Sequence, residues 1–121
     1  MDLVSTYSQQ EVEKMMPTFG KATNFLKSLR ALDSDMPLAQ AHCLLIIAQH
    51  EGLSVKELAD RAGIGMASAS RYISLFSKPS APGRKGLGLV EAREDPLERR
   101  KKIVRLTPKG QTVVKQIMEN L

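Results

Sequence analysis

The chain has 121 residues, a length that fits one compact domain and leaves no room for a second of ordinary size. Its single cysteine excludes an intramolecular disulfide framework and is compatible with a reducing compartment. The sequence has no apolar run long enough to span a membrane, and its N-terminus lacks the charged and apolar regions of a signal peptide. We therefore predict a soluble, cytoplasmic protein.

Most of the basic charge lies in one segment of the chain. Between Lys78 and Lys109 there are ten Lys and Arg residues and four Asp and Glu residues, which give this segment a net charge of +6. The rest of the chain carries −1, and the whole chain +5. Such a distribution is typical of a surface that binds a polyanion. A solvated basic face is the alternative interpretation.

The first predicted element is a helix over residues 8–32, where apolar residues recur every three or four positions. Pro17 interrupts this pattern, so the helix should either kink there or begin afresh with Pro17 in its first turn. The apolar positions lie on more than one side of the helix, which favours contact with a second chain. They are Val12, Met15, Met16, Phe19, Ala22, Phe25, Leu26, Leu29 and Leu32.

A second helix is predicted from Leu38 to Glu51, with Pro37 at its start and Gly52 at its end. Its run of apolar residues predicts a central, buried element. Cys43 lies in its middle and is interpreted as a small buried hydrophobe, with a redox-sensing role as the weaker alternative. His42 and His50 have no accompanying cysteine or carboxylate cluster, so we predict no metal site and no cofactor.

Residues 54–76 have the features of a helix-turn-helix. Ser54 and Glu57 form a capping-box pattern at the start of one short helix, and Gly63 is suited to end it in the left-handed conformation. Gly65 then opens a second helix. Its predicted inward face consists of Ala69, Tyr72, Ile73 and Phe76. Two short helices joined by a glycine turn indicate DNA binding through the second helix.

A loop rich in proline and glycine follows, and two short strands are then predicted, over residues 89–94 and 102–107. The polar, basic sequence DPLERRKK joins these strands. Two strands with a basic tip directly after a helix-turn-helix predict a winged helix. Thr107 and Pro108 are suited to cap and begin a final helix.

The segments LSVKELADRAGIGMASASRYI and GLVEAREDPLERRKKIVRLTPKG resemble the multiple-antibiotic-resistance regulator (MarR) family of bacterial winged-helix transcription factors. The wing matches without a gap, from GLV through Asp95-Pro96 and Arg99-Arg100 to Val104-x-Leu106-Thr107-x-x-Gly110. The resemblance implies one domain over residues 1–121, mainly α-helical with a small β-wing (α+β). Its DNA-binding core would span residues 37–107, with the wing at 89–107 and dimerisation helices at 8–32 and 108–121.

The resemblance further implies a homodimeric repressor that places each recognition helix in a major groove of double-stranded DNA and each wing tip in the adjoining minor groove. The loop over residues 78–86 is longer than usual for the family. The chain also ends after one C-terminal helix where typical members continue into another, so we expect a smaller or rearranged dimer interface. Nothing in the sequence points to a particular small-molecule effector, although the family leaves room for one.

Candidate DNA-binding residues follow from these assignments. On the recognition helix they are Ala67, Ser68, Ser70 and Arg71. Arginine can bind guanine bidentately, serine donates and accepts short hydrogen bonds, and alanine can contact a thymine methyl. On the wing, resemblance assigns Arg99 or Arg100 to the minor groove, with Asp95 either bracing the arginine or shaping the turn. Candidates for phosphate contacts are Lys101, Lys102, Arg84 and Lys85.

Three other functions are alternatives to a regulator. An architectural or replication-associated winged helix without an effector would suit the short C-terminus. A protein-interaction module is less favoured, because such a wing has no need for so many cations. An enzyme is not predicted, because the sequence has no Ser/His/Asp or Cys/His set, no phosphate-binding glycine loop and no metal-ligand spacing.

Overall fold

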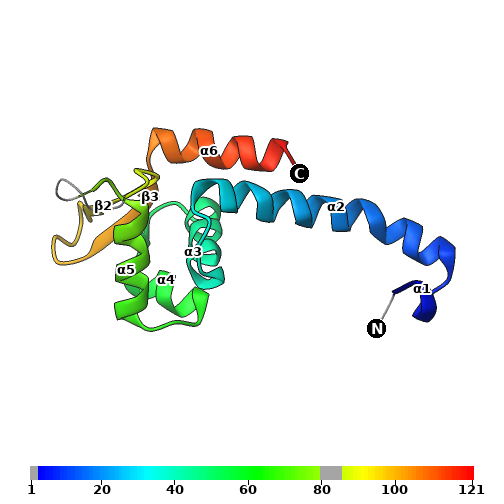
Figure 1. Cartoon of the computed structure of the whole chain (residues 1–121). Coiled ribbons are helices and arrows are strands. Elements are labelled where there is room, and N and C mark those ends of the chain that lie inside the picture. Colours follow the sequence, from blue (N-terminus) through cyan, green and yellow to red (C-terminus); the bar gives the residue numbers. More distant parts are fainter. Residues whose placement is uncertain (1–2, 80–85) are drawn as a thin grey trace.

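The computed structural model describes residues 3–79 and 86–121 and has a winged helix-turn-helix fold of the α+β class. In chain order its elements are α1 (Leu3–Thr6), α2 (Gln9–Leu32), α3 (Leu38–Gln49), β1 (Leu53–Ser54), α4 (Val55–Ala62), α5 (Met66–Phe76), β2 (Val90–Glu94), β3 (Lys102–Leu106) and α6 (Pro108–Glu119). A compact body contains α3 to β3, whereas α2 projects from it and α6 runs beside the inner half of α2 (Figure 1). Within the described ranges, no helix has both the length and the apolar character needed to cross a membrane.

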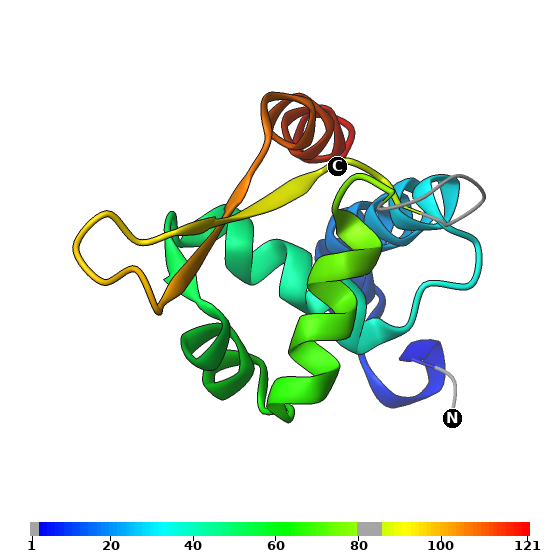
Figure 2. The same ribbon diagram turned by 90° about the vertical axis from the view of Figure 1, so that its left-hand side faces the viewer.

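The three strands form one antiparallel sheet in the order β1-β3-β2. The hairpin pairs Val90 with Leu106 at its base and Glu94 with Lys102 near its tip. The short strand β1 was not predicted from the sequence; Leu53 pairs with Val104 and joins the hairpin to the start of α4. Figure 2 shows the hairpin extending away from the body above α4, beside α5.

The core is built around α3, as predicted. Side chains from α3, α4, α5 and the sheet form one buried cluster, which contains Cys43, Leu44, Ile46, Ile47, Leu53, Leu58, Tyr72, Ile73, Phe76, Leu89, Val90 and Val104. The predicted inward face of the second helix is confirmed, since Ala69, Tyr72, Ile73 and Phe76 are all buried. Cys43 is fully buried, and desolvation raises the pKa of its thiol. It therefore behaves as a core hydrophobe, with little of the thiolate that redox chemistry requires.

The turns of the helix-turn-helix form as their sequence predicts. The hydroxyl of Ser54 accepts a hydrogen bond from the Glu57 amide at 3.1 Å and caps α4. Gly63 ends that helix with φ +69°, a left-handed conformation that favours glycine. Gly65 is the N-cap of α5.

The predicted limits of one helix and of both strands need correction, and the structure excludes one of the two alternatives at Pro17. α3 ends at Gln49 rather than at Glu51, because the backbone of His50 is already extended. The first strand begins one residue later than predicted, at Val90, and the second ends one residue earlier, at Leu106. The helix does not begin afresh at Pro17, since α2 is continuous from Gln9 to Leu32 with Pro17 inside it.

The wing, α5 and α6 meet at the backbone of Leu89. The Leu89 amide donates to the Phe76 carbonyl at 2.7 Å, and the Leu89 carbonyl accepts from the Thr107 amide at 2.9 Å. The Thr107 hydroxyl donates to the Gly88 carbonyl at 2.6 Å and accepts from the Gly110 amide at 3.0 Å. A Cβ at Gly110 would overlap the carbonyl oxygen of Leu89, so this position requires glycine because of the close approach.

We therefore expect Gly110→Ala to lower the free energy of unfolding by about 1–3 kcal/mol, because the added methyl group must push α6 off the Leu89 backbone. Urea unfolding monitored by circular dichroism measures this change. Gln111→Ala is the matched control on the exposed side of the same helix turn and should change stability by less than about 0.5 kcal/mol. Equal stabilities of the two variants would contradict the proposed role of Gly110.

Candidate nucleic-acid interface

The recognition helix presents its N-terminal half to solvent. Ala67, Ser70 and Arg71 are exposed, whereas Ser68 is half-buried. The guanidinium carbon of Arg71 lies 5.3 Å from the centroid of the Tyr72 ring, a cation–π contact that favours one orientation of the arginine. The N-cap Gly65 has no side chain to cap the helix. The amides of the first turn are therefore available to an anion.

The wing tip is a short loop closed by its own backbone. The Asp95 amide donates to the Lys101 carbonyl at 2.8 Å, and the Lys101 amide donates to the Glu98 carbonyl at 2.9 Å. The Asp95 carboxylate accepts from the Leu97 amide at 2.9 Å. Asp95 therefore shapes the turn of the wing tip, which is one of its two predicted roles. In the described part of the chain its carboxylate makes no ion pair with an arginine.

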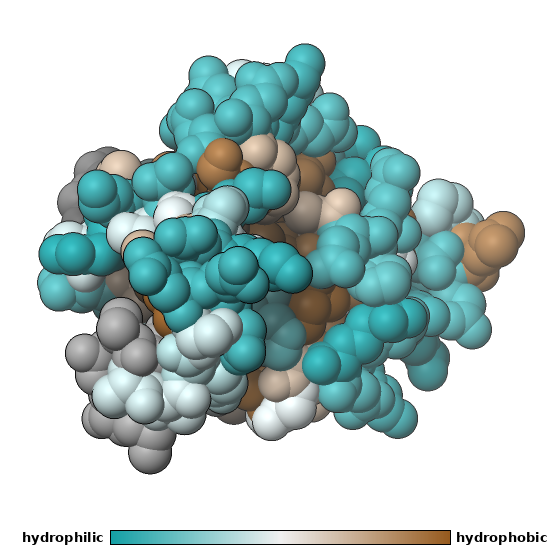
Figure 3. All heavy atoms as spheres, turned by 90° about the vertical axis from the view of Figure 1, so that its right-hand side faces the viewer, coloured by the Kyte–Doolittle hydropathy of each residue, from teal (hydrophilic) through white to brown (hydrophobic). Residues whose placement is uncertain are grey.

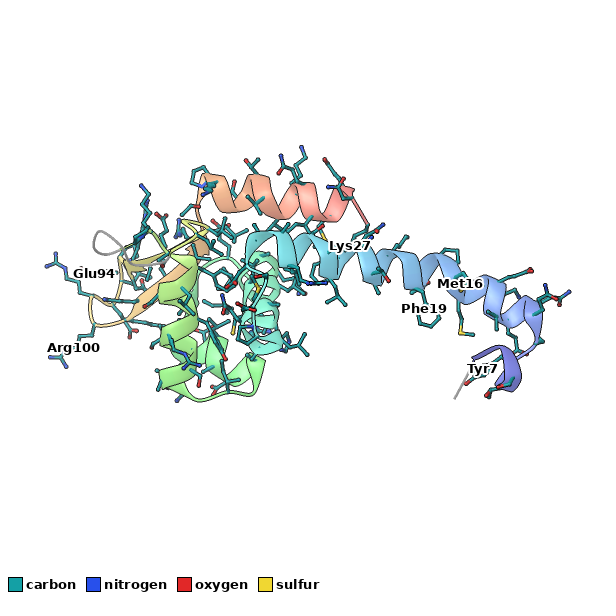
Figure 4. All side chains as sticks on the ribbon, in the orientation of Figure 1. Tyr7, Met16, Phe19, Lys27, Glu94 and Arg100 are labelled. Carbon is teal, nitrogen blue, oxygen red and sulfur yellow. The ribbon has the colours of Figure 1, made fainter. Side chains whose placement is uncertain are left out.

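The cations of the wing differ in how they are paired. The guanidinium of Arg93 pairs with the Glu91 carboxylate at 3.0 Å, and the ammonium of Lys101 pairs with the Glu57 carboxylate at 3.4 Å. In contrast, Arg99, Arg100 and Lys102 are exposed and have no carboxylate partner among residues 3–79 and 86–121. Figure 4 shows the Arg100 side chain extending from the tip into solvent. These three exposed cations are free to bind phosphate.

A groove of about 560 Å³ separates the wing from the helix-turn-helix, and we call it the wing groove. Its walls are residues 54–57 at the start of α4, Met66 and Ser70 of α5, and Arg100, Lys101 and Lys102 of the wing. The fold thus brings four of the predicted site residues to one groove. Ala67, Ser68 and Arg71 lie outside it, further round α5, and Arg84 and Lys85 fall outside the described residues.

Sequence reasoning missed three contributors to this groove, Val55, Lys56 and Met66. It also missed one of the roles of Glu57. Glu57 caps α4 as predicted, but its carboxylate also binds Lys101 across the groove. The hydrogen bonds from Ser54, helped by Lys101, lower the pKa of Glu57. The charge of Glu57 therefore links the start of α4 to the tip loop of the wing. No local pattern in the sequence predicts this ion pair, because Glu57 and Lys101 come from separate elements.

A second groove, of about 610 Å³, lies on the opposite side of the body where α2, α3 and α6 meet; we call it the helix groove. Most of its lining side chains are apolar, among them Phe25, Leu45 and Met118, and Thr18, Lys21 and Gln49 are the polar ones. Figure 3 looks onto this side and shows brown, apolar atoms gathered at its centre between hydrophilic margins. The described residues contain no group of three or more His, Cys, Asp or Glu that could hold a metal ion.

This architecture is shared with solved structures of transcriptional regulators. Regulator Tm0710 from Thermotoga maritima superposes with a TM-score of 0.68 at 21% identity, over 93% of this chain and 73% of that one. Wild-type MarR from E. coli, in its apo form, superposes with a TM-score of 0.63 at 19% identity, over 94% of this chain and 76% of that one. The transcriptional regulator PcaV from Streptomyces coelicolor, in complex with its natural ligand, superposes with a TM-score of 0.59 at 16% identity, over 99% of this chain and 75% of that one.

The chain therefore has the winged-helix fold of the MarR regulators, and the fold expected from the sequence is confirmed. The sequence itself matches no protein-family profile and no curated protein. At these identities, the structural likeness establishes the fold, whereas the chemistry of the surface must come from the residues of this chain.

The Glu57 contacts predict a pH-dependent stability. Because its pKa is lower in the folded chain than the ordinary value of 4.5, the stabilisation is present above that value and is lost as the pH falls through the folded pKa. We expect Glu57→Gln to be less stable than the wild type near neutral pH, with the difference vanishing in acid. Urea unfolding at a series of pH values measures it. A difference that persists unchanged in acid would contradict the role of the charge.

Proposed function

We propose that this protein is a sequence-specific DNA-binding transcriptional regulator of the MarR type, acting as a homodimeric repressor. One observation carries the proposal: Met66 and Ser70 at the exposed start of α5 lie on one side of the wing groove, and the unpaired cations Arg100 and Lys102 lie on the other. A surface that combines an exposed helix with unpaired positive charge suits duplex DNA, whose major groove admits an α-helix and whose backbone is anionic.

The recognition helix supplies the contacts that distinguish sequences. Arg71 is long enough to bind guanine O6 and N7 together, and its contact with Tyr72 reduces the side-chain freedom lost on binding. Ser70 offers a short hydrogen bond from the wall of the wing groove, and Ala67 offers a methyl contact. The uncapped amides at the start of α5 suit a backbone phosphate.

The wing supplies charge beside the recognition helix. Arg99, Arg100 and Lys102 place unpaired cations at the tip and the return strand, where they can neutralise phosphates on either side of the adjoining minor groove. The pair between Lys101 and Glu57 adds no net charge. The backbone pairing of β1 with β3 joins the hairpin to the start of α4 and holds the wing beside the helix-turn-helix.

Dimerisation is supported by how little of α2 the chain buries. This helix has 24 residues, about 36 Å at the usual rise, yet only Leu29 is buried. Met16, Phe19 and Leu26 are about half exposed, and so are Met118 and Leu121 at the edge of the helix groove. A second copy that covers this apolar surface would also set two recognition helices at a fixed distance, as a palindromic operator requires. A dimer spanning such an operator would block access of other proteins, which favours repression.

Selection of bound sequences from a random duplex pool tests the DNA-binding proposal. We expect a palindrome with half-sites about ten base pairs apart, one turn of the double helix. Arg71→Ala should weaken binding to the selected site by about ten-fold or more and relax the sequence preference at one position of each half-site. Recovery of no common sequence would contradict a sequence-specific regulator and favour the architectural alternative.

Placing a charge on the projecting helix tests the dimer. Phe19→Asp should convert a dimer to a monomer, because an unpaired carboxylate would be buried in the apolar contact. Sedimentation velocity measures the mass in solution. Leu38→Asp is the matched control: Leu38 is 79% exposed at the start of α3, away from the helix groove, and its variant should remain dimeric. A wild-type protein that sediments as a monomer would overturn the proposed assembly.

A further inference from the structure

The wing groove contains a negative charge among its cations. Of the described residues that line it, one is acidic, Glu57, and four are basic: Lys56, Arg100, Lys101 and Lys102. A carboxylate in such a place opposes DNA, because it repels the phosphates that the cations attract. Glu57 therefore acts against the binding that the rest of the groove favours.

The contacts of Glu57 hold its side chain in the groove. Its amide donates to the Ser54 hydroxyl at 3.1 Å, and Ser54 in turn donates hydrogen bonds to the Glu57 carboxylate. These hydrogen bonds lower the pKa of Glu57 below its usual value of 4.5, so the side chain is charged at neutral pH. A carboxylate that is fastened to its own helix cap does not turn away when a phosphate approaches.

The same carboxylate engages one of the cations of the wing. The Lys101 ammonium lies 3.4 Å from Glu57, whereas the next residue, Lys102, has no carboxylate partner in the parts of the chain that the structure describes. The side chains of Lys101 and Glu57 are 42% and 49% exposed, so a ligand in the groove can reach this pair. Carboxylate and phosphate oxygens are both charged acceptors for an ammonium group. Glu57 thus binds Lys101 as a phosphate would.

We propose that Glu57 competes with DNA for Lys101 and thereby limits the affinity of the wing groove for any duplex. This inference rests on the proposed DNA-binding function and describes how that site is restrained. While the pair is intact, Lys101 is withheld from phosphate; when Lys101 leaves, the fixed carboxylate stays in the groove and repels the phosphate. Phosphate contacts carry no sequence information, so affinity for an operator and for unrelated DNA falls by the same factor. The restraint weakens non-specific binding and leaves the preference for the operator unchanged.

Glu57→Gln in the full chain tests the competition, because the amide keeps the size of the side chain and removes its charge. We expect this variant to bind a duplex selected by the wild-type protein and an unrelated duplex about three- to ten-fold more tightly at moderate salt. The salt dependence should steepen by about one, since Lys101 gains a phosphate contact. Fluorescence anisotropy titrations at several salt concentrations measure both quantities. Partial unfolding of the variant would weaken binding, so it cannot produce this gain.

Asp60→Asn is the matched control for the change in net charge. Asp60 lies on α4, three residues after Glu57, and is exposed outside the wing groove. It makes no ion pair within residues 3–79 and 86–121, so its replacement releases no cation. We expect the Asp60→Asn variant to keep the salt dependence of the wild type. A steepening equal to that of Glu57→Gln would show an effect of overall charge and overturn the inference.

The two neighbouring lysines of the wing give an independent test. Lys102→Ala should reduce the salt slope by about one, whereas Lys101→Ala should leave it near the wild-type value, because Lys101 is already engaged by Glu57. If the two variants lose equal slope, or if Glu57→Gln binds no more tightly than the wild type, only this inference falls. If the wild-type protein binds no duplex in a salt-dependent manner, the proposed function falls with it.

Discussion

The close approach of α6 to the backbone of Leu89 is the constraint on which the rest of the DNA-binding unit depends. Leu89 binds the last turn of α5 through its amide and the start of α6 through its carbonyl. The base of the wing, the end of the recognition helix and the C-terminal helix are consequently fixed to one residue. The glycine at 110 makes this possible, since any side chain there would separate the two backbones.

Much of this fold could be predicted from the sequence because its signals are local. A serine and a glutamate three residues apart, a left-handed glycine at position 63 and a Thr-Pro pair at 107 each act within one turn of helix. They set the limits of their helices whatever the rest of the chain does. The buried face of α5 follows in the same way, because helical spacing alone brings its four apolar residues to one side.

The contacts that shape the candidate site could not be predicted, because they join distant parts of the chain. The pairing of Glu57 with Lys101 depends on the angle of the hairpin, which a sequence pattern does not contain. β1 is only two residues long, and its backbone pairing with β3 is what makes it a strand. At Pro17 the sequence left two alternatives open, a kink or a new helix start, and α2 is continuous through this residue. Pro17 is exposed, so the carbonyl that loses its helical partner can bind water.

The projecting half of α2 has a consequence for how this protein responds to its own concentration. Tyr7, Met16 and Phe19 lie at the outer end, remote from the body (Figure 4), and the buried anchor Leu29 lies at the inner end. A helix supported at one end loses order progressively towards the other. The outer turns would therefore be fully ordered only when something covers them. If that cover is a second chain, dilution would melt part of a helix as well as separate two subunits, and a steep dependence of operator occupancy on concentration would follow.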